Sequence, residues 1–220
     1  MNPILPVCVQ ICKILCETAT ARYAAPMTTL TPQQKLIQVS LQLQQAAVPI
    51  AQAHMAKQAT LGLEHVLTEA GLSTLDGIAA SLDAMNGMEA LDAWHRSAWE
   101  QWMLEASRRY AEVLEDYPPD ERGAESHGMM ASLQREMQNQ QRQRSARADW
   151  IDAARRVCVL ARRGRELDPE TLGIILADDD DMAEFERQVG RADAASALQQ
   201  TLFEERAARI KAGMEKLQPR

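Results

Sequence analysis

Aromatic residues are scarce in this sequence, and so are the residues that favour strands. Only 4% of its 220 residues are aromatic, against 46% hydrophobic and 25% charged residues. The last two values are ordinary for a folded protein. The abundant Ala, Leu, Gln, Glu and Arg favour helices and disfavour strands. We therefore predict an all-α protein: an elongated helical bundle with a second helical region that contains a long Arg/Gln-rich helix.

Cysteine is also scarce, and its distribution excludes a disulfide framework. Three of the four Cys lie close together at Cys8, Cys12 and Cys16, and the fourth is Cys158. This pattern is typical of a protein in a reducing cytoplasm. On a helix the first three thiols would span about 12 Å, which is too far for one metal ion. We expect no metal site there.

No apolar run is long enough to cross a membrane. The longest, from Pro3 to Cys16, is interrupted by Gln10 and Lys13. Its length of about 14 residues is below the roughly 20 that a transmembrane helix needs, and it lacks the positive start of a signal peptide. The segment 1–30 shares no pattern with the rest of the chain. Translation that starts at Met27 instead of Met1 would explain this, and the two starts stay open.

Sequence signatures of enzymes are absent. The chain has no phosphate-binding glycine loop, no nucleophile elbow and no zinc-type His pair. A carboxylate-bridged metal bundle needs Glu three residues before His, and only Asp92 before His95 comes near that pattern. We predict no catalytic residue, no metal and no cofactor. Either His54, His65 and His95 are partly buried structural histidines, or they form a pH-responsive contact.

Charge is uneven along the chain. The net charge of -7 argues against a protein whose whole surface binds nucleic acid. Nine Arg nevertheless lie within 135–165, and nine acidic residues with no basic one lie within 166–186. Either the two segments neutralise each other, or the basic one binds an external acidic protein or nucleic acid. The candidate partner-binding arginines are Arg142, Arg144, Arg147, Arg155 and Arg156.

The first helical region is predicted at 31–117. Thr31, Pro32 and Gln34 have the pattern of a capped helix start. The apolar stripe of this first helix extends to about residue 70, with a kink at Pro49. A short helix follows at 73–85 and is expected to end at Asn86 and Gly87.

A long amphipathic helix is then expected at 88–117. Its apolar stripe falls within about 80° of the helix circumference. Such a stripe either packs within a bundle or is offered to another protein, an oligomer mate or a lipid or polymer surface. We treat Trp99, Trp102 and Tyr110 as candidate partner-binding residues. The full stripe is Met88, Leu91, Trp99, Trp102, Ala106, Tyr110, Val113 and Tyr117.

Residues 118–128 contain two Pro and two Gly and are predicted to form a hinge or linker. The second region, 129–220, is predicted to hold the Arg/Gln-rich helix, short acidic helices and a C-terminal amphipathic helix. A short helix is expected at 168–177 and a further start near Asp181. The C-terminal helix is expected at 193–217.

These patterns favour a non-catalytic cytoplasmic interaction or assembly protein, such as an adaptor, a chaperone-like protein or a scaffold. It would bind protein partners, or copies of itself, through amphipathic helices. A nucleic-acid-associated regulator that uses the Arg-rich helix is the first alternative. In general composition, residues 31–117 resemble phasins, the amphipathic helical proteins that coat storage-polymer granules. That resemblance implies a second alternative, a coat on a granule or lipid surface.

Overall fold

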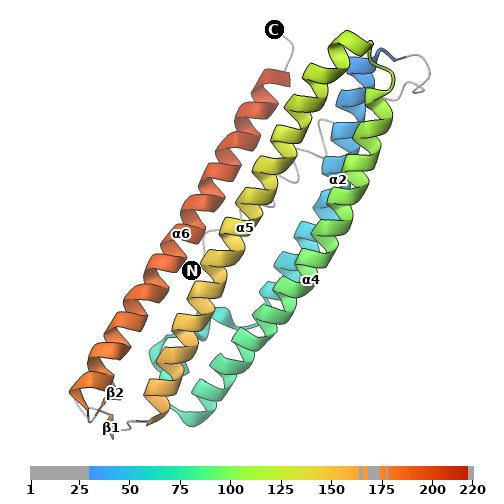
Figure 1. Cartoon of the computed structure of the whole chain (residues 1–220). Coiled ribbons are helices and arrows are strands. Elements are labelled where there is room, and N and C mark those ends of the chain that lie inside the picture. The colour runs from blue at the N-terminus through green and yellow to red at the C-terminus, as the bar shows by residue number, and fades with distance from the viewer. Residues whose placement is uncertain (1–29, 164–165, 168–173, 177, 218–220) are drawn as a thin grey trace. The chain divides into compact units, whose positions relative to one another are not determined.

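The computed structural model describes residues 30–163, 166–167, 174–176 and 178–217. Within them, helices dominate and the all-α prediction is confirmed (Figure 1). The predicted N-terminal segment 1–30, with Cys8, Cys12 and Cys16, lies outside the described residues except for Leu30. The elements are α2 (Pro32–Gln58), η2 (Leu63–His65), α3 (Glu69–Leu72), α4 (Leu75–Leu114), α5 (Pro119–Arg163), β1 (Glu166–Leu167), β2 (Ile174–Ile175) and α6 (Asp179–Leu217).

Helix α2 begins as predicted. The backbone N–H of Thr31 donates to Gln34 Oε1 at 2.9 Å, and the N–H of Gln34 donates to Thr31 Oγ1 at 3.2 Å. This reciprocal pair satisfies two backbone donors that a helix start leaves free. Helix α2 continues through Pro49 without being split.

The predicted continuation of this helix to residue 70 is wrong, because α2 ends at Gln58. The chain turns at Gly62, whose φ of 68° is a left-handed conformation that glycine adopts readily. The helices predicted separately at 73–85 and 88–117 are one helix, α4. A Cβ at position 87 would lie 2.7 Å from Leu61 Cδ2. Gly87 therefore gives room for Leu61 and does not end the helix.

The prediction of a linker at 118–128 is wrong for residues 119–128, which form the first turns of α5. Pro119 occupies the first helical position, where proline costs nothing because its missing N–H would have no partner. Arg122 closes the end of α4 by donating to the carbonyl oxygens of Glu115 and Tyr117, at 2.9 and 3.2 Å. The chain reversal is therefore short and hydrogen-bonded.

The helix predicted at 168–177 is wrong in its described residues 174–175, whereas the helix start predicted near Asp181 is confirmed within two residues, because α6 begins at Asp179 and continues through the helix predicted at 193–217. The β-branched pair Ile174–Ile175 forms a two-residue strand that pairs antiparallel with Glu166–Leu167. Residues 168–173 and 177 of the predicted helix at 168–177 lie outside the described part. Asp179, Asp180 and Asp181 form the first turn of α6, a single helix of 39 residues. Acidic residues favour a helix N-terminus because of the helix dipole.

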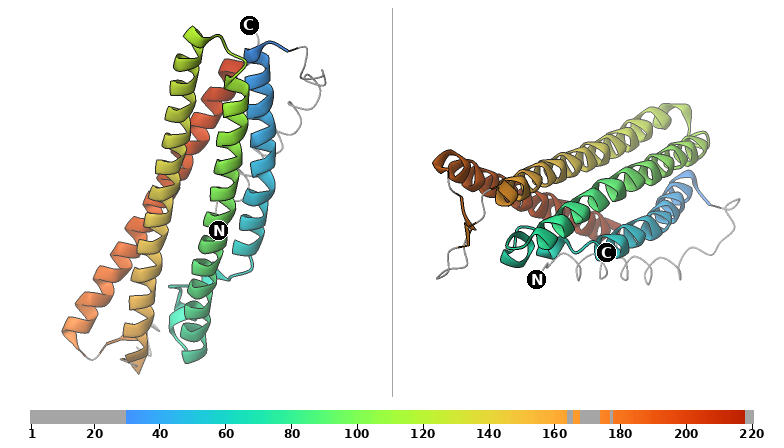
Figure 2. Two further views of the ribbon diagram at one scale, coloured as in Figure 1. Left: turned by 45° about the vertical axis from the view of Figure 1, so that its right-hand side comes forward. Right: turned by 90° about the horizontal axis from the view of Figure 1, so that it is seen from below.

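Two compact units make up the chain, and they are interleaved in sequence instead of following the predicted division at 118–128. Unit 1 consists of Met1–Gln58 and Leu91–Glu136, and unit 2 of Ala59–Ala90 and Met137–Arg220. In unit 1, α2 runs beside the second part of α4 (Figure 2). In unit 2, α6 runs beside the second part of α5 in the opposite direction (Figure 2).

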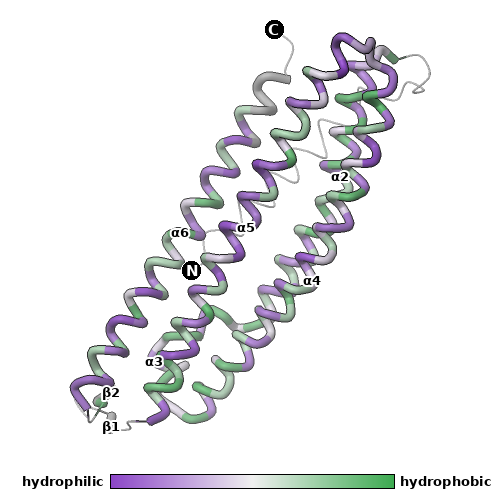
Figure 3. Tube along the Cα trace, in the orientation of Figure 1, coloured by the Kyte–Doolittle hydropathy of each residue, from purple (hydrophilic) through white to green (hydrophobic). Residues whose placement is uncertain are grey.

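Each unit has its own buried residues. The core of unit 1 is a cluster of residues from α2, from the second part of α4 and from just beyond its end, namely Val39, Leu43, Ala106, Val113, Leu114 and Tyr117. In unit 2 the buried residues of α5 and α6 are mostly small. Hydrophilic and hydrophobic residues alternate along the helices (Figure 3). In the described residues, no helix combines the length and the apolar character that a membrane span requires.

Candidate interaction surfaces

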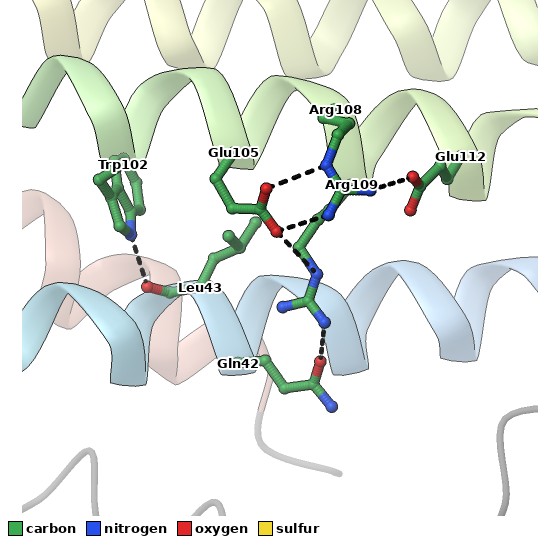
Figure 4. Close-up of polar contacts among 7 residues, drawn as sticks. All are labelled: Gln42, Leu43, Trp102, Glu105, Arg108, Arg109 and Glu112. Atoms are coloured by element: carbon green, nitrogen blue, oxygen red, sulfur yellow. Dashed lines mark hydrogen bonds and ion pairs between the residues drawn. The ribbon is translucent and has the colours of Figure 1, made fainter.

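The aromatic stripe of α4 packs inside unit 1. Trp99 is 8% exposed, and its ring stacks on Trp102 with ring centroids 4.6 Å apart. Trp102 reaches α2, where its indole Nε1 donates to the carbonyl oxygen of Leu43 at 2.9 Å (Figure 4). The hydroxyl of Tyr110 donates to Ser40 Oγ at 3.2 Å. The three aromatic candidates for partner binding therefore use their apolar bodies, and two of them their polar atoms, within this unit.

Polar residues line both sides of this seam. Arg109 donates to Gln42 Oε1 at 2.9 Å (Figure 4), and Lys35 Nζ pairs with Asp116 Oδ2 at 2.8 Å. Burial raises the pKa of the Tyr117 hydroxyl, and the negative charges of the Glu125 and Glu121 carboxylates raise it further. The seam is thus closed by hydrogen bonds and an ion pair that connect α2 with α4.

The opposite face of α4 carries an exposed ion-pair network. Arg108 contacts Glu105 and Glu112, one turn away on either side (Figure 4). The hydrogen bond from Arg108 lowers the pKa of Glu105, and the same bond raises the pKa of Arg108. Such exposed i,i+3 and i,i+4 pairs support the helix weakly. This face is the solvated side that the sequence pattern indicates.

A pair of histidines lies where α2 ends beside α4. The His54 and His95 ring centroids are 4.6 Å apart, and His54 Nε2 lies 3.9 Å from Asp92 Oδ1. His95 in turn stacks on Trp99, while Lys57 Nζ lies 4.1 Å above the Trp94 ring. The prediction that His54 is at least partly buried is confirmed, since it is 8% exposed.

His65 differs from this prediction. Its side chain is 72% exposed, because the chain has left α2 before this residue and forms a short 3-10 turn at the surface. The pattern of histidines also gave no indication that the His54 and His95 rings would lie against each other, because they come from different helices.

The arginines of α5 contact acidic residues of unit 2. Arg155 reaches Glu89 with two hydrogen bonds, at 3.1 and 3.0 Å, and donates to Asn86 Oδ1 at 2.9 Å. The hydrogen bond to Glu89 raises the pKa of Arg155. Arg156 lies 3.6 Å from Glu184, which belongs to the predicted acidic segment. Arg156 therefore makes one of the predicted neutralising contacts. Arg155 pairs instead with Glu89 of α4, which lies outside the predicted acidic segment.

The two arginines nearer the middle of α5 are less tightly held. Arg142 lies 3.7 Å from Glu205 on α6, and both side chains are about half exposed. Arg144 donates to Gln141 on its own helix at 3.1 Å. Arg147, the fifth candidate, is partly buried. The five predicted arginines thus follow one helix but do not converge on one surface site.

Arg191 of α6 was not among the predicted site residues. It donates to Asp152 at 2.6 Å and to Asp149 at 3.1 Å, and these bonds raise its pKa. Both partners are present in the sequence. The sequence does not show the antiparallel register of α5 and α6, which brings together residues about 40 positions apart. This register fixes which charges neutralise each other.

The first half of α5 has a different character. None of its residues 119–136 is buried in the structure. Met130 is 56% exposed and Met137, two turns further, is 57% exposed, with the partly buried Leu133 between them. The i, i+3, i+7 spacing puts the three on one side of the helix. This apolar stripe, which we call the Met130–Met137 stripe, could have been found from the spacing but was not among the predicted site residues.

The comparisons with known proteins give no relative. The fold of the described residues defines the chain as an all-α protein built from long helices. No family model, no curated protein and no solved structure matches the sequence or the fold. Among the described residues, no group of three or more His, Cys, Asp and Glu is arranged to hold a metal ion.

Proposed function

We propose that the protein is a non-catalytic interaction or assembly protein of the cytoplasm, and that the first half of α5 is its main partner-binding surface. The observation that carries the proposal is the absence of any buried residue among the described positions 119–136. Eighteen helical residues correspond to about 27 Å of helix. A helix of this length in a folded protein normally gains its stability by packing an apolar face.

The local sequence makes this stretch a weak helix by itself. It contains Gly123 and Gly128, for which an added Cβ would meet nothing within 4 Å. Neither glycine is needed for close packing, and each disfavours a helix by about 1 kcal/mol relative to alanine. From this stretch Met129 packs against the core of unit 1, and a partner on the exposed side would supply further stabilisation. The flexible thioether side chains of the Met130–Met137 stripe suit an adaptable helix contact.

The two alternative functions have less support. A nucleic-acid-binding surface needs free arginines, whereas Arg155 and Arg156 contact Glu89 and Glu184. A coat protein would present its aromatic stripe to the granule or lipid surface. Trp99 and Tyr117 are instead buried, and Trp102 is bound to Leu43.

Site-directed cross-linking tests the proposal in the native cell. A photoreactive residue at position 130 should yield a cross-linked protein, or a cross-linked dimer of this chain, that Met137→Asp removes. The matched control carries the same probe at position 130 together with Leu104→Asp. Leu104 is 73% exposed but lies on α4, so this substitution should leave the cross-link in place. Light scattering over a range of concentrations distinguishes self-association from a foreign partner.

Several outcomes would contradict the proposal. Cross-links that survive Met137→Asp, or a monomer with no cross-link at position 130, would exclude this surface. Turnover of a small molecule that is abolished by one polar substitution would exclude a non-catalytic role. Salt-sensitive retention on DNA that is lost with Arg142→Gln would favour the regulator instead.

A further inference from the structure

The methionine side chains of the structure differ sharply in exposure. Met129 packs against the core of unit 1, whereas its direct neighbour Met130 is 56% exposed. Two turns further along α5, Met137 is 57% exposed. No other methionine whose side chain the structure describes is exposed, and Met85 and Met88 of α4 are buried at 0% and 1% exposure. The two exposed thioethers therefore lie together on the Met130–Met137 stripe.

Exposure decides which methionines an oxidant can reach. A peroxide oxidises a thioether when the sulfur lone pair attacks one peroxide oxygen. The S–O bond forms and the O–O bond breaks, so the sulfur loses two electrons. The leaving hydroxide takes the proton of the transferred oxygen and becomes water. The product is a polar sulfoxide, which methionine sulfoxide reductases convert back to the thioether at the expense of a dithiol.

Oxidation changes the free and the bound states of this surface unequally. In the protein alone, a sulfoxide on the Met130–Met137 stripe lies in water, so its oxygen is hydrated and the fold loses little. Under a partner, the same oxygen leaves water without a matching hydrogen-bond donor, which is unfavourable. Oxidation should therefore weaken a contact made with this stripe and leave the helix itself in place.

We propose that Met130 and Met137 form a reversible oxidation site for peroxides, and that their sulfoxides release the partner bound at the Met130–Met137 stripe. Only the release rests on the proposed function. The choice of these two residues as the oxidation site rests on their exposure and on the burial of Met85 and Met88. Reduction of the sulfoxides restores the apolar stripe, so the partner contact follows the supply of peroxide and of reductase.

Peptide mass spectrometry of the full chain treated with hydrogen peroxide tests the oxidation site. In the folded protein Met130 and Met137 should be oxidised at least about tenfold faster than Met129, Met85 and Met88, and in urea all five should react alike. Met129 is the sharpest internal control, because it has the same local sequence as Met130. Equal rates at positions 129 and 130 in the folded protein would overturn the proposal.

Cross-linking in an extract of the native cell tests the release. A photoreactive residue at the exposed position 134, one turn from Met130, leaves both methionines in place. Its cross-link should fall at least about fivefold after hydrogen peroxide and return after treatment with the reductases. The control is the double variant Met130→Leu with Met137→Leu, which keeps an apolar stripe of similar volume that peroxide does not oxidise. Its cross-link should survive the same treatment.

The outcomes separate this inference from the proposed function. A cross-link that persists when Met130 and Met137 are oxidised, or that peroxide removes equally from the double leucine variant, overturns the release and leaves the proposed surface intact. The absence of any cross-link before oxidation contradicts the proposed function and the release together, while the oxidation rates still decide on the oxidation site. Loss of helix on oxidation, as circular dichroism would show, would also overturn the release as described.

Discussion

Units 1 and 2 join long helices in two different ways. In unit 1, large side chains connect α2 and α4. Two of them, Trp102 and Tyr110 of α4, also form hydrogen bonds to α2. On α5 and α6, unit 2 buries many small side chains, six of them alanines, and ion pairs connect the two helices at the edge. Small side chains permit a closer approach of two helices. A sequence with few aromatic residues can thus concentrate them in one unit and rely on close packing in the other. The buried alanines of α5 and α6 are Ala146, Ala153, Ala154, Ala161, Ala192 and Ala195.

The two modes should fail in opposite ways. Unit 1 should be sensitive to loss of volume, which leaves a cavity, and unit 2 to gain of volume, which forces the helices apart. Fluorescence can follow the units separately, because Trp94, Trp99 and Trp102 belong to unit 1 and Trp150 to unit 2.

The largest effect is expected for Leu43→Ala in unit 1. Leu43 is 2% exposed, and the loss of a buried leucine side chain should lower the free energy of unfolding by about 3 kcal/mol. Urea unfolding followed by tryptophan fluorescence measures this change. Leu104→Ala, at a residue 73% exposed, should change it by less than about 0.5 kcal/mol. Equal losses in both variants would contradict the assignment of the core.

The thiol of Cys158 reports the integrity of unit 2. Burial raises its pKa from 9.0 to about 11. At pH 8 the folded protein should therefore contain about a hundredfold less thiolate at this position than the unfolded chain, and iodoacetamide should react correspondingly slowly. Peptide mass spectrometry at position 158, with and without urea, measures the two rates.

The raised pKa of Cys158 also makes the free energy of unfolding depend on pH. The protonated thiol is favoured in the folded state, so its contribution is fully present below pH 9 and is lost between pH 9 and about 11. Cys158→Ser, whose hydroxyl does not ionise in that range, should lack this loss. A folded protein whose Cys158 reacts as fast as in urea would show that unit 2 is open.

Ala154→Leu in unit 2 tests the close packing of small residues. Ala154 is 0% exposed, and three added carbon atoms should lower the free energy of unfolding by about 2 kcal/mol. The fluorescence of Trp150 should report this loss. Ala148→Leu, at an exposed position of the same helix, is the matched control and should be nearly neutral. A neutral Ala154→Leu would mean that the two units do not differ in their packing.

The smallest effect is expected for the ion pairs. Arg155→Gln breaks the paired hydrogen bonds to Glu89, whose side chain is about half exposed, and should cost less than about 1 kcal/mol. The difference from the unsubstituted protein should shrink in 1 M salt, where charges are screened within about 3 Å. Arg162→Gln at an exposed position is the control. A loss above about 2 kcal/mol would mean that the ion pairs contribute more to the stability of unit 2 than the packing of its alanines does.

Features encoded by neighbouring residues were predictable from the sequence. The Thr31–Gln34 capping pair and the inward-facing stripe of α4 are of this kind, because each depends on spacing within a single helix. The glycines and prolines at 86–87 and 118–128 were misinterpreted as breaks. Gly87 leaves room for the Leu61 side chain, and Pro119 starts a helix, so their roles depend on surroundings that spacing does not reveal.

The candidate sites show the same limit. Trp99, Trp102 and Tyr110 were correctly placed on one face of a helix, but the sequence left open whether that face packs within the chain. The partners of the arginines could not be predicted, because Arg155 contacts Glu89, 66 positions away. Whether these residues also bind a partner stays a prediction.

The sequence alone determined that this is an all-α protein, because helix propensity, capping and amphipathic spacing act over a few residues. Only the tertiary structure decided which helices are continuous, which charges are paired and which apolar residues are left uncovered. These depend on the register between helices distant in sequence, and the register is fixed by the packing of whole faces.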